Sequence, residues 1–576
     1  MATHTATGSQ NTIAVLSALL LTFLTPQTFA GFEYGIMAGE VESDSVLIWS
    51  RTGSSDPVVV RYGLSETTLN QTSAVINPLA ANDYTFQSEL TNLTASTVYH
   101  YQVVINPGGT EELSDIGRFK TAPDDHVYGP VRLGISGDIR GDGGPRFDYL
   151  TAQSFDVYLA VGDWPYADAA TDQATYWDEH KKARDSSTTH GFMASTSISA
   201  TWDDHEFFNN VSGITTPPSA RVQAAIKAMH DYFPFRYTGT NDIYRSFKYG
   251  AGIEVFMLDT RRHRDSNNAP NDTSKTMLGL TQRAWLFNAL SASTADFKLI
   301  VTSVPLDHGT TGNDHWIGFL HERQLIRDHI INHKIGGALF LATDQHWLSV
   351  NQYPDGIREY ITGPLTAGVR NPPAVPAYVR SQVAVDNYGV LEYTPATQNT
   401  QATLKLEARN FNDDSLVYTE TMNAGCGELQ LNMVNDPQAS WTITGDYYRE
   451  GSGTTHLPYL SPGDYTISFT YGTTPVDIAP IDFTIEDGQV TNLTPVVSSE
   501  SGISIIGSDD FSSSTAADYD TVDQGTVSAP SVWEISGGQL LQRSNIYDQN
   551  GSSDGYPIEK LGSMFIRKGN MGCDGT

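Results

Sequence analysis

The sequence predicts a multidomain protein with a β-sandwich at the N-terminus, an α/β sandwich in the centre and all-β modules at the C-terminus. The chain has 576 residues, whereas one domain usually holds about 100–200 residues. Short β-branched and aromatic runs occupy both ends of the chain. Between Val131 and Thr421, apolar strand-like runs instead alternate with helical patterns, which is typical of a layered α/β domain with a buried sheet.

Composition excludes several classes of protein. The formal net charge is −32, from 34 Lys and Arg against 66 Asp and Glu, and such a chain is repelled by phosphate backbones. Nucleic-acid binding by charge is therefore excluded. Hydrophobic residues make up 39% of the chain, enough to bury several cores, which argues against disorder. Cys426 and Cys573 lie too far apart for a disulfide scaffold or a cysteine zinc site.

The N-terminus predicts a signal peptide over residues 1–30. Residues 13–24 form an apolar run of 12 residues, which is too short to span a bilayer. Small residues precede Gly31, as cleavage would require, and no twin-arginine pair is present. We therefore expect a Sec-type signal and a secreted, periplasmic or cell-surface protein, with a short hydrophobic anchor as the alternative.

Residues 31–123 are expected to form the first β-sandwich. Four β-branched and aromatic runs are separated by Gly, Ser, Asn and Pro turns: VLIWSR, VVVRYG, YTFQSEL and TVYHYQVVI. The closing segment, with GRFKTAP after the last run, resembles the end of a fibronectin type III-like module.

Residues 124–423 are expected to form the α/β domain. Its predicted strands are VRLGI, VYLAVG, SISATW, EVFML, KLIVTSV and GALFLA. Segments 219–233, 281–290 and 321–333 between them carry apolar residues at three- and four-residue spacing, which predicts helices.

The C-terminal part is expected to contain small β-modules. Residues 424–497 resemble a PEGA-like β-domain, and residues 498–508 form a Ser/Gly-rich linker. Residues 509–576 resemble the opening of a jelly-roll or laminin G-like domain, which needs more residues than are present. We expect a cell-surface or polysaccharide ligand for these modules.

Chemistry-bearing side chains follow the predicted strands of the central domain. The strands are followed by Asp138, Asp163, the segment Asp203-Asp204-His205, Asp259 and Asp344. Each residue taken singly is more often a helix cap or turn residue. However, the carboxyl ends of parallel strands meet at one edge, and so many carboxylates raise one another's pKa unless cations neutralise them. Oxygen and imidazole ligands without thiolate suit hard or borderline metals, so we predict a metal centre.

These residues belong to a series of motifs that resembles the alkaline phosphatase D-type, or PhoD-like, metallophosphoesterases. The resemblance spans about residues 31–421 in the order typical of the family. It rests on GDWPY (162–166), TWDDHEFFNN (201–210), FMLDTRRHR (256–264), MLGLTQRAWL (277–286), TDQH (343–346) and ITGPLTAG (361–368).

The resemblance implies a two-metal centre, with iron and calcium favoured. It implies metal-ligand roles for Asp138, Asp163, Tyr166, Asp204, Asp344 and His346. Asp163 resembles the carboxylate that bridges the two metals, and Tyr166 resembles a phenolate ligand of a ferric ion; Asp203 stays an alternative to Asp204. His205 resembles the group that protonates the leaving oxygen, and Arg261 is a candidate phosphate clamp.

The chain departs from the family pattern at three positions. Asp138 stands where a cysteine ligand is frequent, Arg140 stands where the Asp-x-His start of metallophosphoesterases has histidine, and Thr343 stands where glycine is common. These departures make the first metal position and the identity of its metal the least determined part of the site.

The predicted activity is metal-dependent hydrolysis of a phosphoester by a secreted, monomeric enzyme. The resemblance does not distinguish phosphomonoesters from phosphodiesters, because the loops around the pocket decide this. The alternative is a catalytically inactive cell-surface protein that binds through its C-terminal β-modules. A bound metal would discriminate between them.

Overall fold

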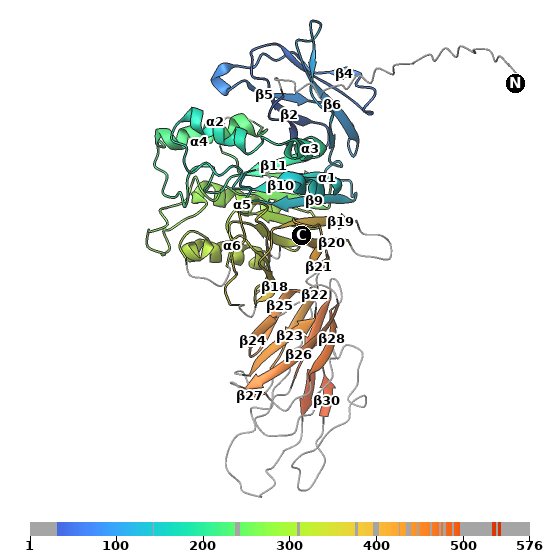
Figure 1. Ribbon diagram of the computed structural model, residues 1–576. Coiled ribbons are helices and arrows are strands. Elements are labelled where there is room, and N and C mark those ends of the chain that lie inside the picture. The colour runs from blue at the N-terminus through green and yellow to red at the C-terminus, as the bar shows by residue number, and fades with distance from the viewer. Residues whose placement is uncertain are drawn as a thin grey trace, which may run out of the picture.

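The computed structural model describes most of residues 32–495 (Figure 1). The gaps are residues 142, 237–241, 308–311, 334, 375–377, 396–401, 425–426, 434–438, 446–448, 461–462, 472–473, 476–479 and 486–488. Beyond residue 495, two short strands are described, β30 (Trp533–Ser536) and β31 (Gln539–Gln542). The predicted signal peptide and linker lie outside the described residues, as does nearly all of the predicted jelly-roll segment.

The first large sheet has nine strands. In spatial order they are β21 (Leu416–Asn423), β20 (Thr403–Asn410), β19 (Asn387–Thr394), β9 (Val131–Ser136), β10 (Val157–Val161), β11 (Ser197–Thr201), β1 (Ile36–Gly39), β2 (Val46–Arg51) and β5 (Thr85–Leu90). The central strands β9, β10 and β11 run parallel, with Val157 paired to both Leu133 and Ser197. Their carboxyl ends therefore lie side by side.

The second large sheet has seven strands. In spatial order they are β12 (Arg245–Tyr249), β13 (Ile253–Met257), β14 (Phe297–Val301), β15 (Ala338–Ala342), β17 (Arg358–Ile361), β16 (Leu348–Gln352) and β18 (Val379–Val383). Strands β13, β14, β15 and β17 are parallel. All six strands predicted for the central region are confirmed, but they divide between two sheets rather than forming one.

The two sheets share a core, and helices cover their outer faces. Leu133 and Leu159 of the first sheet lie in the same buried cluster as Leu299 and Leu341 of the second. The helices are α1 (Phe147–Ala152), α2 (Gln173–Lys182), α3 (Ser187–Ser195), α4 (Ala220–Tyr232), α5 (Gly279–Ala292) and α6 (Leu320–Asn332). Helices α1–α4 contribute to the cluster on the outer face of the first sheet, and α5 and α6 to that of the second. The three predicted helices are α4, α5 and α6.

Local sequence explains where the helices begin. The Ser219 side chain accepts a hydrogen bond from the Val222 amide at the start of α4, and Asp172 with Thr175 forms a capping box at the start of α2. These caps satisfy amides that have no partner within the helix. Three short 3₁₀ turns complete the helical elements: Ala80–Asn82, Gly144–Arg146 and Trp316–Phe319.

The N-terminal strands are divided between two sheets. Strands β1, β2 and β5 extend the large nine-stranded sheet, where Ala38 pairs in parallel with Ser197 of β11. A separate five-stranded sheet contains β3 (Val58–Gly63), β4 (Gln71–Thr72), β6 (Val98–Ile105), β7 (Glu112–Leu113) and β8 (Gly117–Lys120). The region from residue 31 to 123 is thus rich in strands, as predicted, but one of its sheets continues into the central domain.

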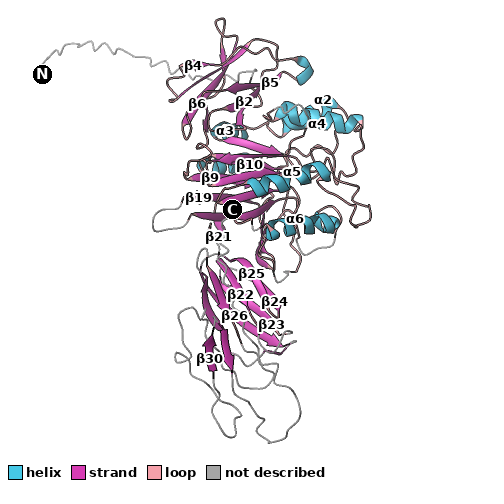
Figure 2. Cartoon of the chain, turned by 180° about the vertical axis from the view of Figure 1, so that it is seen from behind, coloured by secondary structure: helices cyan, strands magenta, loops and turns pink. Residues whose placement is uncertain are grey.

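The C-terminal part contains only strands and loops among its described residues (Figure 2). Its strands are β22 (Gly427–Leu431), β23 (Ser440–Gly445), β24 (Arg449–Ser452), β25 (Thr455–Leu460), β26 (Gly463–Tyr471), β27 (Thr474–Pro475), β28 (Ile481–Ile485) and β29 (Val490–Leu493). They form two sheets around their own core, which includes Leu429, Trp441 and Ile467. The all-β character is as predicted, while the PEGA-like assignment stays a prediction.

Within the described residues, no helix combines the length and the apolar character that crossing a membrane requires.

Candidate metal centre

The candidate site lies where strands of both large sheets end. Asp138 follows β9, Asp163 follows β10, Asp204 follows β11, and Asp344 and His346 follow β15. Four of these residues, Asp138, Asp163, Asp344 and His346, have φ between 55° and 70°. Side chains other than glycine rarely adopt this left-handed conformation, and strain of this kind clusters at functional sites.

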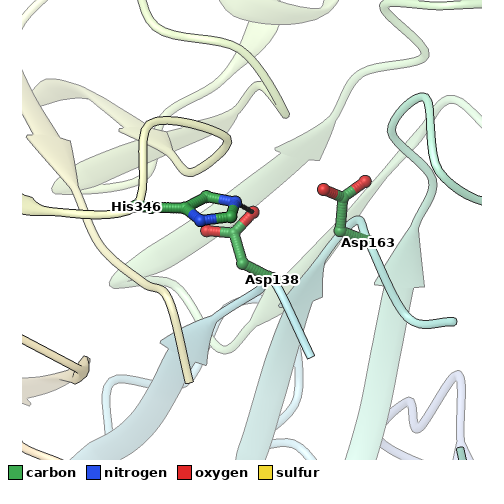
Figure 3. Close-up of side chains that lie close together, drawn as sticks. All are labelled: Asp138, Asp163 and His346. Atoms are coloured by element: carbon green, nitrogen blue, oxygen red, sulfur yellow. Dashed lines mark ion pairs between the residues drawn. The ribbon is translucent and has the colours of Figure 1, made fainter. Parts of the chain in front are cut away.

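Asp138, Asp163 and His346 form the first ligand group. All three are buried, and one ligand atom from each lies within 4.8 Å of the others. Figure 3 shows both carboxylates at the ends of neighbouring strands and the imidazole approaching from a loop. His346 Nε2 lies 3.8 Å from Asp138 Oδ1, while Nδ1 donates to the Gly368 carbonyl at 2.7 Å. That bond leaves Nε2 as the atom free to bind a metal.

Two further groups continue from the first, each sharing one member with the group before it. Asp163 also forms a group with Asp204 and His205, and Asp204 forms another with Asp203 and Asp344, each within the same 4.8 Å limit. Asp163 is therefore common to two adjacent groups. A carboxylate in that position can bridge two cations.

His205 is held by a carboxylate that the sequence did not identify. Its Nδ1 lies 2.8 Å from both oxygens of Asp168, so Nδ1 donates and Nε2 faces the site, 3.9 Å from Asp163 Oδ2. The His205 amide also donates to Asp163 Oδ1 at 3.2 Å. An imidazole fixed in this way can carry a proton on Nε2.

Tyr166 lies between two of the candidate groups. Its hydroxyl is 3.1 Å from His346 Nε2, and its ring centroid is 4.1 Å from that of His205. Burial, followed by the charge of Asp163, raises the pKa of the Tyr166 phenol. The phenol would therefore lose its proton only beside a cation. A metal ion bound by Tyr166, as the predicted ligand role implies, would be such a cation.

Arg261 is fully buried and occupied by carboxylates. Its Nη2 donates to Asp203 Oδ2 at 2.9 Å, and its Nη1 donates to the two oxygens of Asp314 at 2.7 and 2.9 Å. This arrangement does not fit the predicted phosphate clamp, because the hydrogen-bonding edges of the guanidinium already have partners. Arg261 instead neutralises Asp203, whose other partners include Ser303 Oγ at 2.6 Å.

We expect Arg261→Met to lower the stability of the protein by about 3–5 kcal/mol, because it leaves the buried carboxylate of Asp203 without its counter-ion, while Asp314 keeps its ion pair with Arg264. The matched control is Arg262→Ala, which removes a partly exposed ion pair with Asp242 and should cost less than about 1 kcal/mol. Urea unfolding midpoints of both variants provide the measurement. Unchanged stability together with a raised KM for phosphoesters would instead restore the phosphate-clamp role.

The carboxylates of the site are electrostatically crowded. Burial raises the pKa of Asp138, Asp163 and Asp344, and the charge of a neighbouring aspartate raises each further. Burial also acts on Asp203, but Arg261 outweighs it, and the pKa of Asp203 is lowered overall. Burial and the charge of Arg370 lower the pKa of His346 to about 4, so its imidazole is neutral, as metal binding requires.

The donor set fits cations. Both oxygens of Asp138 and Oδ1 of Asp204 are buried and lack a hydrogen-bond partner among the described residues, although buried polar atoms normally have one. Carboxylate and phenol oxygens with one imidazole nitrogen match hard or borderline metals. A cation would satisfy these atoms and reverse the raised pKa values.

Several contributing residues were not among the predicted site residues, although Glu206 and Asp314 lie within stretches that resemble the family. Asp168 and Asp314 lie outside the strand ends that drew attention. Glu206 accepts hydrogen bonds from the Trp164 and Asp203 amides at 2.7 and 2.8 Å and so ties together two of the ligand loops; burial raises its pKa to about 8. Asp259, which does follow a strand, accepts from the Trp202 indole at 2.7 Å and belongs to no ligand group.

Two of the unusual positions have clear structural surroundings. The Thr343 hydroxyl donates to the Val161 carbonyl at 2.6 Å and so links the end of β15 to the end of β10. Arg140 is exposed, and its guanidinium lies 5.3 Å from the centroid of the Tyr166 ring.

Comparisons with known proteins identify the family to which the chain is similar. The PhoD-like phosphatase family matches residues 146–420, and the N-terminal domain of the same family matches residues 24–123. Alkaline phosphatase D of Bacillus subtilis is 23% identical over 385 residues, which cover 55% of this chain and 65% of that protein. The match thus spans less than two thirds of the relative's length.

Two solved structures share the fold. A structure of PhoD matches with a TM-score of 0.61 and 19% identity, covering 69% of this chain and 91% of the other. A purple acid phosphatase from yellow lupin (Lupinus luteus) seeds matches with a TM-score of 0.51 and 14% identity, covering 68% and 74%. The two family matches together extend over well over half of the chain. The chain belongs to the PhoD-like phosphatase family.

Proposed function

We propose that this protein is a metal-dependent phosphoester hydrolase. The observation that carries the proposal is the position of Asp163, whose carboxylate belongs to two adjacent ligand groups. When bound, two cations would supply the charge that holds a phosphate and would lower the pKa of a water molecule. The presence of both groups that contain Asp163 argues against the alternative, an inactive binding protein.

The ligands divide between two positions. We assign Asp138, Asp163, Tyr166 and His346 to the first, and Asp163, Asp204 and Asp344 to the second. Asp204 is preferred to Asp203 because Arg261 and Ser303 already engage Asp203. A phenol oxygen favours ferric iron at the first position, and an all-carboxylate set favours calcium at the second.

His205 is the general acid in this proposal. Asp168 fixes its Nδ1, so that Nε2 points towards Asp163 and can deliver a proton to the leaving oxygen. Asp168 acts through His205 and is a positioning residue.

We expect chelation to abolish hydrolysis and also to make stability depend on pH. The raised pKa values of Asp138, Asp163 and Asp344 mean that the folded, metal-free protein resists ionising these groups. The contribution of these three groups to stability should therefore be greatest below about pH 4, the ordinary aspartate pKa, and should be lost as the pH rises through their raised pKa values. Returning iron and calcium should restore turnover and remove most of this pH dependence in the melting temperature.

The test measures metal content, melting temperature from pH 4 to 8, and turnover of a panel of phosphomonoesters and phosphodiesters. Full activity after complete removal of metal would refute the proposal. Absence of bound metal and of turnover in the protein as purified would favour the inactive binding protein. The same panel decides between monoester and diester preference.

Four broader expectations stay part of this proposal. The signal sequence favours a secreted, periplasmic or cell-surface location, and the C-terminal modules would take a cell-surface or polysaccharide ligand. The predicted domain limits, with the catalytic domain at residues 124–423, and a monomeric state are retained on the same basis.

A further inference from the structure

Two exposed arginines lie beside the candidate metal centre. Arg140 follows Asp138 by two residues, and Arg370 follows the loop whose Gly368 carbonyl holds His346. The chain carries a net charge of −32, so an exposed cation next to a group of aspartates is an unusual local feature. In the part of the chain that the structure describes, neither guanidinium is paired with a carboxylate.

Backbone hydrogen bonds bring the two arginines to the same rim. The Leu365 amide donates to the Gly137 carbonyl, and the Thr366 and Ala367 amides donate to the Asp138 carbonyl, at 3.1–3.2 Å. The Thr366 hydroxyl donates to the Arg140 carbonyl at 3.0 Å. The loop after β9 and the loop after β17 are thus joined along their length.

Arg370 is tied directly to the ligand loop. Its amide donates to the His346 carbonyl at 2.9 Å, and the charge of its guanidinium contributes to the lowered pKa of His346 and opposes the rise in the pKa of Asp138. The positive charge therefore acts on the first ligand group although the side chain itself is exposed.

Arg140 lies on the same side of the site as Tyr166 and the proposed acid His205. Its guanidinium is 5.3 Å from the centroid of the Tyr166 ring, and that ring in turn contacts His205, the proposed acid, with centroids 4.1 Å apart. The reacting phosphate belongs on the buried ligands, whereas Arg140 and Arg370 are solvent-exposed. A second anionic group of the substrate that contacts the arginines would therefore be part of the leaving group.

We propose that Arg140 and Arg370 form an anion-recognition rim that selects substrates whose leaving group carries a second anionic group, either a phosphate or a carboxylate. Arginine suits both, because its planar donors match the oxygens of either anion. The inference rests on the proposed function and deepens it by naming a substrate class. Neither arginine is a metal ligand, so metal content is expected to be independent of both.

The test compares three aryl monoesters that react in the same way: phenyl phosphate, 3-carboxyphenyl phosphate and 1,3-phenylene bisphosphate. In the variant Arg140→Ala/Arg370→Ala, we expect kcat/KM to fall about 10-fold more for the two doubly anionic substrates than for phenyl phosphate, through KM. The carboxylate and bisphosphate arms show which second anion is preferred. The control Lys248→Ala removes a partly exposed cation of β12 that lies opposite Glu254 in the strand register, near the start of β13 and away from the ligand-bearing strand ends, and should change none of the ratios.

Equal losses on all three substrates would overturn the proposal, because they would indicate that the arginines contact the reacting phosphate. The absence of any loss would also overturn it. If the unaltered protein hydrolyses none of the three, the proposed function fails instead. Calorimetric binding of phenylphosphonate and of 3-carboxyphenylphosphonate to the metal-loaded protein then tests the rim by itself. Weaker binding of the carboxylated compound alone in the double variant would support the rim.

Discussion

Asp163→Ala should remove both bound metal and turnover. Its carboxylate is the member common to the groups formed with Asp138 and His346 and with Asp204 and His205. Losing it therefore weakens both of the proposed cation positions at once, whereas Asp138 belongs to a single group and Asp204 is assigned to the second position only. We expect turnover to fall by more than about 10³-fold, beyond the cost of deleting one transition-state hydrogen-bond donor.

The same substitution should not unfold the protein. Burial and neighbouring carboxylates raise the pKa of Asp163, so at neutral pH its charge opposes folding of the metal-free chain. Metal-free Asp163→Ala should thus melt at or above the temperature of the metal-free parent. The control Asp172→Ala removes the exposed N-cap of α2 and should keep full metal content. An Asp163→Ala protein with both metals and near-parental turnover would refute the two-metal site.

The sequence was informative where chemistry follows a buried strand. The runs ending at Asp163 and Asp344 could be identified because five apolar residues in a row are typical of a strand covered on both faces, and VRLGI before Asp138 departs from that pattern only at Arg132. Their meeting at one place followed from parallel pairing. The sequence could not predict that β9, β10 and β11 lie in one sheet and β13, β14 and β15 in another. Hydrophobic periodicity indicates that a strand is buried, but it does not indicate which strands or helices cover it.

Residues that act through others were the main omission. Asp168 holds His205 from a loop of no regular pattern, and Asp314 meets Arg261 across 53 positions of sequence. No local spacing marks such a contact. Arg261 is the opposite case, a residue that was assigned a direct role. A guanidinium suits phosphate, but the burial of Arg261 and its carboxylate partners arise only in the folded chain and could not be read from the sequence.

The N-terminal boundary illustrates the same limit. Turn residues and β-branched runs correctly indicated strands before residue 123. The antiparallel pairing of β1 with β2 is local in sequence, but the bridge from Ala38 to Ser197 is not. A single parallel contact of this kind joins the N-terminal strands to the central ones in one sheet, and neither segment carries a sequence pattern that indicates it.

His205→Ala should slow the enzyme by an amount that depends on the leaving group. A positioned general acid typically contributes about 10²–10⁴ in rate, but only when the departing oxygen needs a proton. Alkyl phosphoesters should therefore lose about 10²-fold or more, while nitrophenyl esters, whose leaving group departs as a stable anion, should lose little. Metal content should stay at the parental level, because Asp163 and Asp204 remain to hold the second position.

Asp168→Asn is the matched variant for this prediction. Its amide oxygen can still accept from His205 Nδ1 but carries no charge to stabilise the protonated ring, so the same preference for good leaving groups should appear in weaker form. Equal losses on alkyl and nitrophenyl esters, accompanied by loss of metal, would instead make His205 a ligand of the group it forms with Asp163 and Asp204. If neither ester class slows, His205 takes no part in the reaction, and the proton for the leaving oxygen must come from another group of the site.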